Sequence, residues 1–68
     1  MPERHRKAAQ RHDDAALRHE EAALHWDNWG DPEHAELERR NVEIERAAAQ
    51  LERDRADFIQ RKRAASTA

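Results

Sequence analysis

Residues 29–33 read WGDPE and hold the strongest turn signal in this chain of 68 residues. Glycine suits the left-handed position just after a helix, aspartate caps the start of the next helix, and proline fits its first turn. We therefore predict an all-α antiparallel two-helix hairpin, because a connection this short makes the helices neighbours. The helices should span about residues 3–29 and 32–63, with residues 1–63 forming the hairpin domain. The remaining tail, residues 64–68, is expected to fray.

The composition favours helices and argues against several classes of protein. Charged residues make up 41 % of the chain, and alanine, glutamate, arginine and leucine, all strong helix formers, dominate it. The chain has no cysteine, no glycine-rich phosphate loop and no apolar run near the roughly 18 residues that a membrane span needs. We therefore expect a cytoplasmic protein that is not an enzyme and has no membrane partner.

The first helix contains a seven-residue repeat. Its pattern, Arg-His-x-x-Ala-Ala-x, begins at residues 4, 11 and 18. A heptad repeat of this kind is typical of a helix that packs along one seam. The repeat places His5, His12 and His19 on one stripe between two rows of alanine, and Trp26 continues the stripe. We predict that the histidines lie at the centre of this small-residue face.

The second helix carries two apolar rows, each with a spacing of seven residues. The first, called the apolar row below, consists of Leu37, Ile44, Leu51 and Phe58. The second is weaker and consists of Ala35, Val42, Ala49 and Ala56. One row can pack against the first helix, and the other needs a further surface. A second copy of the chain is the simplest source of that surface. We therefore predict a homodimer that forms a four-helix bundle, or a larger homo-oligomer, associated through the apolar row. A different protein is the alternative partner.

A row of glutamates runs between these two apolar rows, and the hairpin sets it beside the row of histidines. Both His19–Glu38 and His19–Glu45 are within reach, so the register stays open. Three interpretations follow: interhelical pairs that set the register, an assembly that depends on pH, or a metal site for zinc or iron. Successive histidines are seven residues apart, roughly 10 Å along the helix, so a metal needs ligands from two helices. The candidate ligands are His5, His12, His19, Glu38, Glu45 and Glu52.

Both tryptophans of the chain stand close to the turn. We predict that Trp26 and Trp29 form an apolar plug that closes this end of the hairpin against Ala35 and Leu37. The alternative is an exposed aromatic anchor for a partner.

The net charge of −2 hides a strong polarity along the hairpin. Residues 1–12 and 55–68, which form its open end, contain eight basic and two acidic residues, whereas residues 13–54 contain five basic and thirteen acidic residues. Two interpretations follow. The open end binds a nucleic acid, or it lies over the acidic turn of a second copy in an antiparallel dimer, which we favour because a nucleic-acid binder of this size is usually basic overall. The basic patch consists of Arg4, Arg6, Lys7, Arg11, Arg61, Lys62 and Arg63.

In size and topology the predicted dimer resembles the Rop family of plasmid copy-number proteins, short helical hairpins that dimerise and bind RNA. The resemblance rests on size and topology alone, and it implies nucleic-acid binding through the basic open end. From the residues themselves, we expect a small interaction or regulatory protein that acts through helix–helix contacts. A metal-binding bundle that uses the histidine and glutamate rows is the other alternative.

Overall fold

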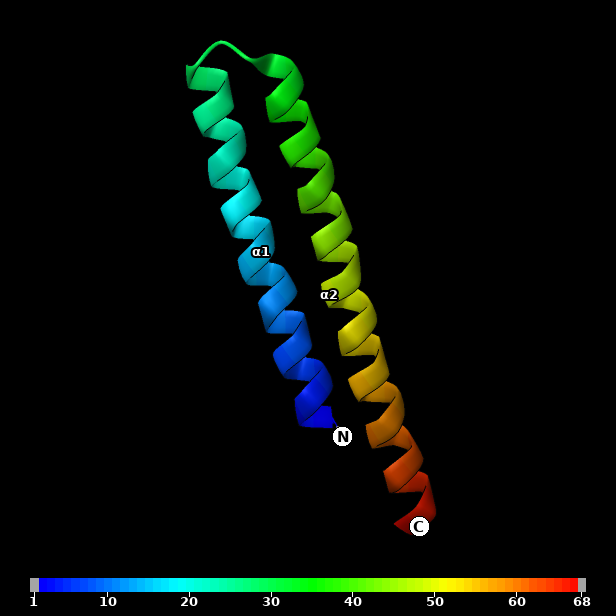
Figure 1. Ribbon diagram of the computed structural model, residues 1–68. Coiled ribbons are helices and arrows are strands. Elements are labelled where there is room, and N and C mark those ends of the chain that lie inside the picture. Colours follow the sequence, from blue (N-terminus) through cyan, green and yellow to red (C-terminus); the bar gives the residue numbers. More distant parts are fainter. Residues whose placement is uncertain (1, 68) are drawn as a thin grey trace.

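A computed structural model describes residues 2–67 as two long antiparallel helices joined by a tight turn (Figure 1). Helix α1 spans Pro2–Asn28 and helix α2 spans Pro32–Thr67, and the described residues contain no strand. The predicted hairpin is therefore confirmed. The predicted end of the second helix near Arg63 is wrong, because α2 continues through Thr67. Alanines 64 and 65 are strong helix formers, and no glycine or proline follows to end the helix. Ala68, the end of the predicted tail, lies outside the described residues.

The turn has the hydrogen bonds of a Schellman motif. Gly30 adopts φ +77°, its N–H donates to Asp27 O at 3.1 Å, and the N–H of Asp31 donates to Trp26 O at 2.9 Å. The Asp31 carboxylate then caps α2 by accepting the backbone N–H of His34 at 3.0 Å. This backbone hydrogen bond is the main reason why the pKa of Asp31 lies below its ordinary value. The turn signals read from the sequence thus act as predicted.

Replacing Gly30 with alanine should destabilise the hairpin by about 1 kcal/mol, because a β-carbon is disfavoured at positive φ. The added atom would meet nothing within 4 Å, so the cost comes from the backbone and not from crowding. Thermal unfolding followed by circular dichroism should show a melting temperature about 4–8 °C lower. Gly30→Asn should lose less, because asparagine tolerates this conformation. Equal melting temperatures for Gly30→Ala and the wild type would contradict the prediction.

The helices meet along a seam of very small side chains. The seam is built by every seventh residue of each helix, and no member exposes more than 6 % of its surface: Ala9, Ala16, Ala23, Ala35, Val42, Ala49 and Ala56. The weaker row of the second helix is therefore the one that packs inside the hairpin. The prediction that the histidines occupy the centre of this face is wrong, because the alanines occupy it and the histidines lie at its edge. Small side chains let the helix backbones approach closely, and an imidazole at the centre would hold them apart.

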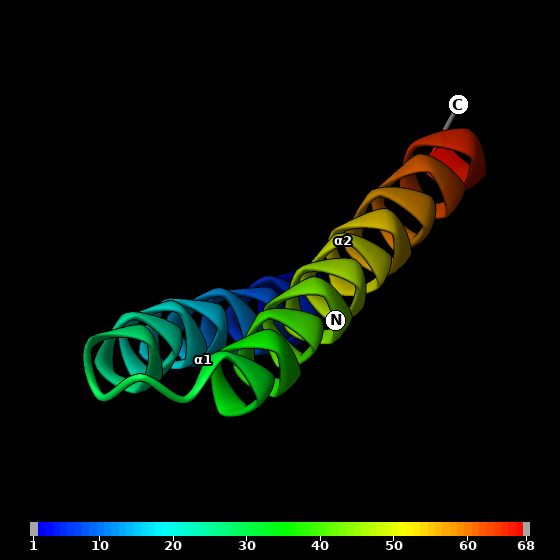
Figure 2. The same ribbon diagram turned by 90° about the horizontal axis from the view of Figure 1, so that it is seen from above.

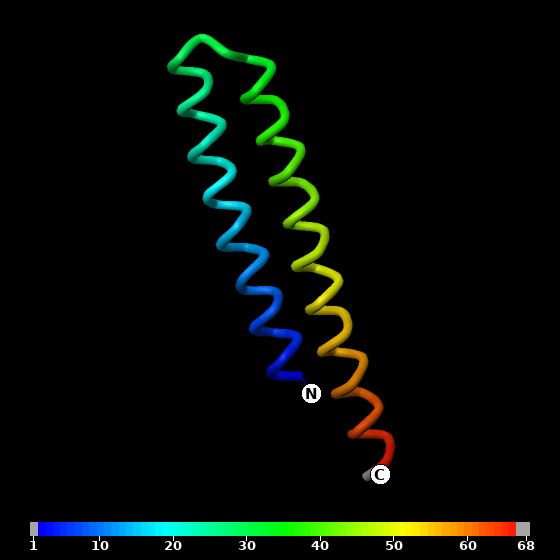
Figure 3. The backbone as a smooth tube through the Cα atoms, viewed as in Figure 1, coloured from blue at the N-terminus to red at the C-terminus, as the bar shows by residue number. Residues whose placement is uncertain are grey.

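The hairpin is a single layer of helix. Its Cα atoms span 58 × 14 × 9 Å, and Figures 2 and 3 show two helices side by side with nothing above or below them. Both broad faces of the hairpin therefore face outward. Residues 2–67 contain ten large apolar side chains, of which seven are at least half exposed and only Val42 is buried. Beyond the start of α1, the last turns of α2 project alone (Figure 3).

Candidate functional site

Three histidines of α1 each pair with a glutamate of α2 along one edge of the seam. The Nδ1–Oε2 distances are 2.5 Å for His5–Glu52, 2.6 Å for His12–Glu45 and 2.6 Å for His19–Glu38. We call these three pairs the His–Glu ladder. All three pairs adopt the same one of the two registers that the sequence left open. Since a carboxylate only accepts hydrogen bonds, each Nδ1 donates as N–H.

The ladder is partly shielded from solvent. Side-chain exposure is 25 % for His5, 38 % for His12 and 32 % for His19, and lower for each glutamate. The hydrogen bond from His5 lowers the pKa of Glu52 below its ordinary value of 4.5; desolvation opposes this effect, and Arg55 at 2.7 Å adds to it. The pairing with His5 therefore favours the ionised form of Glu52 in the folded hairpin.

Glu52→Gln should make the melting temperature less sensitive to acid. Because the pKa of Glu52 is lower in the folded than in the unfolded chain, its contribution to stability is present above pH 4.5 and is lost as the pH falls through the lower native value. Melting curves recorded from neutral pH into the acid range should fall more steeply for the wild type than for Glu52→Gln. The exposed Glu43 offers a control, and Glu43→Gln should keep the acid slope of the wild type. Parallel acid slopes for wild type and Glu52→Gln would refute the prediction.

The opposite edge of the seam is held by arginine–carboxylate pairs. They are Arg39–Asp27, Arg46–Glu20 and Arg53–Asp13. These pairs were not predicted from the sequence, although their acidic and basic members each recur every seven residues. Because permanent charges line one edge and imidazoles line the other, the two broad faces of the hairpin differ chemically.

The apolar row lies on the outside of α2, on the side of the His–Glu ladder. Each residue of an α-helix is rotated about 100° around the helix axis from the one before it. Measured from Ala35, which lies in the seam, Glu38 is therefore about 60° around α2 in one direction and Arg39 about 40° in the other. Leu37 is turned about 160° in the direction of the glutamate. Between these positions, Ala48 is half-buried, and on α1 the half-buried Ala8, Ala15 and Ala22 flank the ladder. We call this surface, from the α1 alanines across the ladder to the apolar row, the ladder face.

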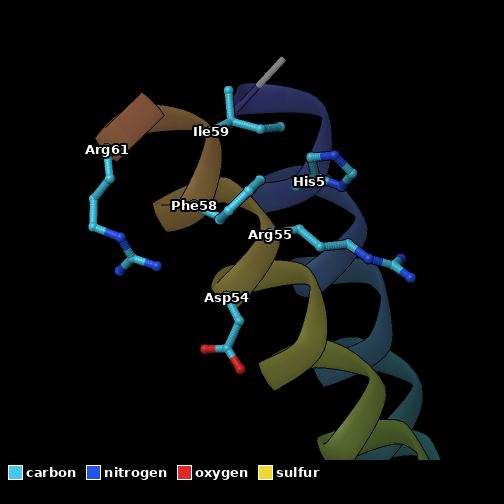
Figure 4. A pocket seen from close by; sticks show the side chains of 6 residues that line it. All are labelled: His5, Asp54, Arg55, Phe58, Ile59 and Arg61. Carbon is cyan, nitrogen blue, oxygen red and sulfur yellow. The ribbon is translucent and has the colours of Figure 1, made fainter. Parts of the chain in front are cut away.

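A shallow depression at the open end lies between the His–Glu ladder and the apolar row, and residues of both line it. It is lined by His5, Asp54, Arg55, Phe58, Ile59 and Arg61. Figure 4 shows Phe58 of the apolar row and His5 of the ladder among the side chains around this depression, with Ile59 near both. Lys62 extends this surface, with its Nζ 5.6 Å from the centre of the Phe58 ring.

The apolar row predicted to mediate association is well exposed. The exposed fractions are 54 % for Leu37, 63 % for Ile44, 50 % for Leu51 and 53 % for Phe58. None of these side chains is taken up by the hairpin's own core. The row is thus accessible to a partner along its whole length.

The tryptophans do not form the predicted plug. Trp29 is 74 % exposed and Leu37 is also exposed, so neither closes the end of the seam. Trp26 instead stacks on His34, with ring centres 4.2 Å apart, and His34 Nδ1 lies 2.7 Å from the Asp31 carboxylate. Trp26 occupies the position that the next ladder histidine would take.

The predicted basic patch is brought together at the open end. The N-terminal turns of α1 carry Arg4, Arg6, Lys7 and Arg11, and the projecting end of α2 carries residues 61–63 (Figure 1). Arg6 of α1 donates a hydrogen bond to Gln60 Oε1 of α2 at 2.5 Å, which links the two helices within the patch. The acidic turn lies at the far end of the molecule.

The six candidate metal ligands come together only in pairs. Over residues 2–67, no group of three or more histidine or acidic side chains is placed to hold a metal ion. In each His–Glu pair the two candidate ligands are hydrogen-bonded to each other, and no third ligand joins them. A single hairpin therefore does not supply the predicted metal centre.

Neither described helix combines the length and apolar character that crossing a membrane requires. Comparisons of the chain with protein families, curated proteins and solved structures find no match.

Proposed function

We propose that this chain is an interaction protein that works as a homodimer, in which the ladder faces of two hairpins pack into a four-helix bundle, and that it does not catalyse a reaction. The observation that carries the proposal is the distribution of apolar side chains. The hairpin's own core consists of alanine and one valine, whereas the four large side chains of the apolar row are at least half exposed. Small helical hairpins bury too little surface to be stable without further packing.

The size of the ladder face is of the same order as the interface of a stable dimer. Leu37 and Phe58 are 21 residues apart on α2, or roughly 32 Å along the helix. Two helices side by side are about 20 Å wide, which makes a footprint of roughly 600 Å². Stable interfaces bury about 800 Å² of accessible surface per partner, so the face is of the required order.

The charge distribution favours an antiparallel pair. A two-fold axis across the hairpin, through the middle of the apolar row, sets the basic open end of one chain over the acidic turn of the other. In this arrangement Ile44 packs opposite the partner subunit's Leu51, and each helix is antiparallel to its neighbours. The edge of the seam that carries the arginine–carboxylate pairs stays exposed to solvent in this dimer. These charged pairs therefore remain hydrated and are not desolvated by dimerisation.

Sedimentation equilibrium at micromolar concentration tests the proposal. We expect a species of twice the 8.0-kDa chain mass, with apparent stability that rises with protein concentration. A folded species of single-chain mass at these concentrations would overturn the proposed homodimer.

The basic open end supports nucleic-acid binding as a second candidate function. The projecting end of α2 places residues 61–63 beyond α1, where they are accessible together with Arg4 and Lys7. An RNA gel shift that weakens steeply with added salt would support this candidate. Absence of a shift at low salt would reject it.

A further inference from the structure

The His–Glu ladder holds its imidazoles in the way that proteins hold metal-binding histidines. Each Nδ1 donates to a glutamate oxygen at 2.5–2.6 Å, so the ring is oriented and Nε2 is the nitrogen that remains for another partner. A carboxylate on one ring nitrogen orients a metal-binding histidine and raises its basicity at the other nitrogen. His12, with 38 % of its side chain exposed, is the most accessible of the three.

One chain cannot complete such a site. Neighbouring ladder histidines are seven residues apart, roughly 10 Å, whereas two ligands of one zinc ion lie within about 4 Å of each other. Each level of the ladder therefore presents one imidazole. A second imidazole has to come from a second chain.

The proposed homodimer brings that second imidazole to the level of His12. His12 contacts Glu45 on one edge and Asp13 contacts Arg53 on the other, so residues 12 and 13 lie level with the stretch 45–53 of α2. The middle of the apolar row, between Ile44 and Leu51, lies at that level. A two-fold axis through this point sets His12 of each chain opposite His12 of the partner subunit. Away from the axis, packed helices cross at about 20° and matching positions move apart.

Resting on the proposed homodimer, we infer that a divalent transition-metal ion of the zinc type binds between two copies of the chain, ligated by Nε2 of His12 from each. Glu45 orients each ring through Nδ1, and water completes the coordination. Imidazole is a ligand that zinc accepts readily, and the absence of cysteine leaves it as the best zinc ligand in the chain. The bound ion would join the two subunits.

Zinc titration by calorimetry, on protein purified without a histidine tag and treated with a chelator, tests the inference. We expect one ion for every two chains. His12→Gln should abolish this binding, and Glu45→Gln should weaken it about 10–100-fold, the usual effect of losing an orienting partner. His34→Gln, which removes a histidine outside the ladder, should bind as the wild type does. Binding that survives His12→Gln, or that His34→Gln removes equally, would overturn the inference.

Sedimentation with and without zinc separates this inference from the proposed function. A metal-free dimer that takes up no zinc would overturn the metal site and leave the homodimer intact. A metal-free monomer would overturn the apolar-row dimer, and if zinc then paired the chains through His12, the metal site would stand alone. His12→Gln should remain folded, because the alanine seam does not include it, and circular dichroism checks this.

Discussion

Replacing both Ile44 and Leu51 with glutamate is expected to convert the proposed homodimer into a monomer. The two side chains form the middle of the apolar row and are 63 % and 50 % exposed on the single hairpin, so neither supports its internal packing. Burying such a side chain contributes roughly 1.5–3 kcal/mol, and in an antiparallel pair each substitution occurs twice. The variant also places four carboxylates at the centre of the interface, where they would lose hydration without gaining partners. The affinity of the two chains for each other should therefore fall by a factor of roughly 1,000 or more.

Sedimentation equilibrium measures this effect directly, and the chain supplies a matched control. Leu17 and Leu24 are 55 % and 62 % exposed, but each follows a seam alanine by one residue and so lies on the arginine–carboxylate side. Leu17→Glu with Leu24→Glu makes the same change of charge and should remain dimeric. If the control dissociates and the Ile44 and Leu51 variant does not, the ladder face is not the interface.

Ala49→Leu should destabilise the hairpin itself more than any other single change considered above. Ala49 has no exposed surface and lies midway along the seam, where helix backbones approach closely. A leucine cannot fit without separating the helices, which would also stretch the hydrogen bonds at both edges of the seam. Overpacking of this kind costs about 1–3 kcal/mol, and the melting temperature of a chain this size should fall by about 10 °C or more.

The control for this substitution lies two residues away. Ala47 is exposed on α2, so Ala47→Leu adds the same atoms to the same helix outside the seam. Thermal unfolding at one protein concentration should show a large loss for Ala49→Leu and little change for Ala47→Leu. A similar melting temperature for both variants would mean that the alanine seam is not the packed core.

Local chemistry made much of the fold predictable from the sequence. Gly30 and Asp31 act on their own neighbours, so the end of one helix and the cap of the next could be read directly. The histidine and glutamate rows were also expected to meet, because their spacing of seven residues matches. The end of α2 was harder to place, since alanines after Arg63 neither stop a helix nor require it to continue.

The amino-acid sequence alone determined that this chain is two helices with one turn, and that it carries two rows able to pack. Only the tertiary structure decided which row turns inward. Alanine and valine allow the backbones to come close enough for His–Glu and arginine–carboxylate pairs to close on both edges, whereas leucine and phenylalanine would hold them apart. The same closeness selects one ladder register and moves the histidines from the centre to the edge. It also leaves the largest apolar side chains outside, because a seam this narrow has no room for them.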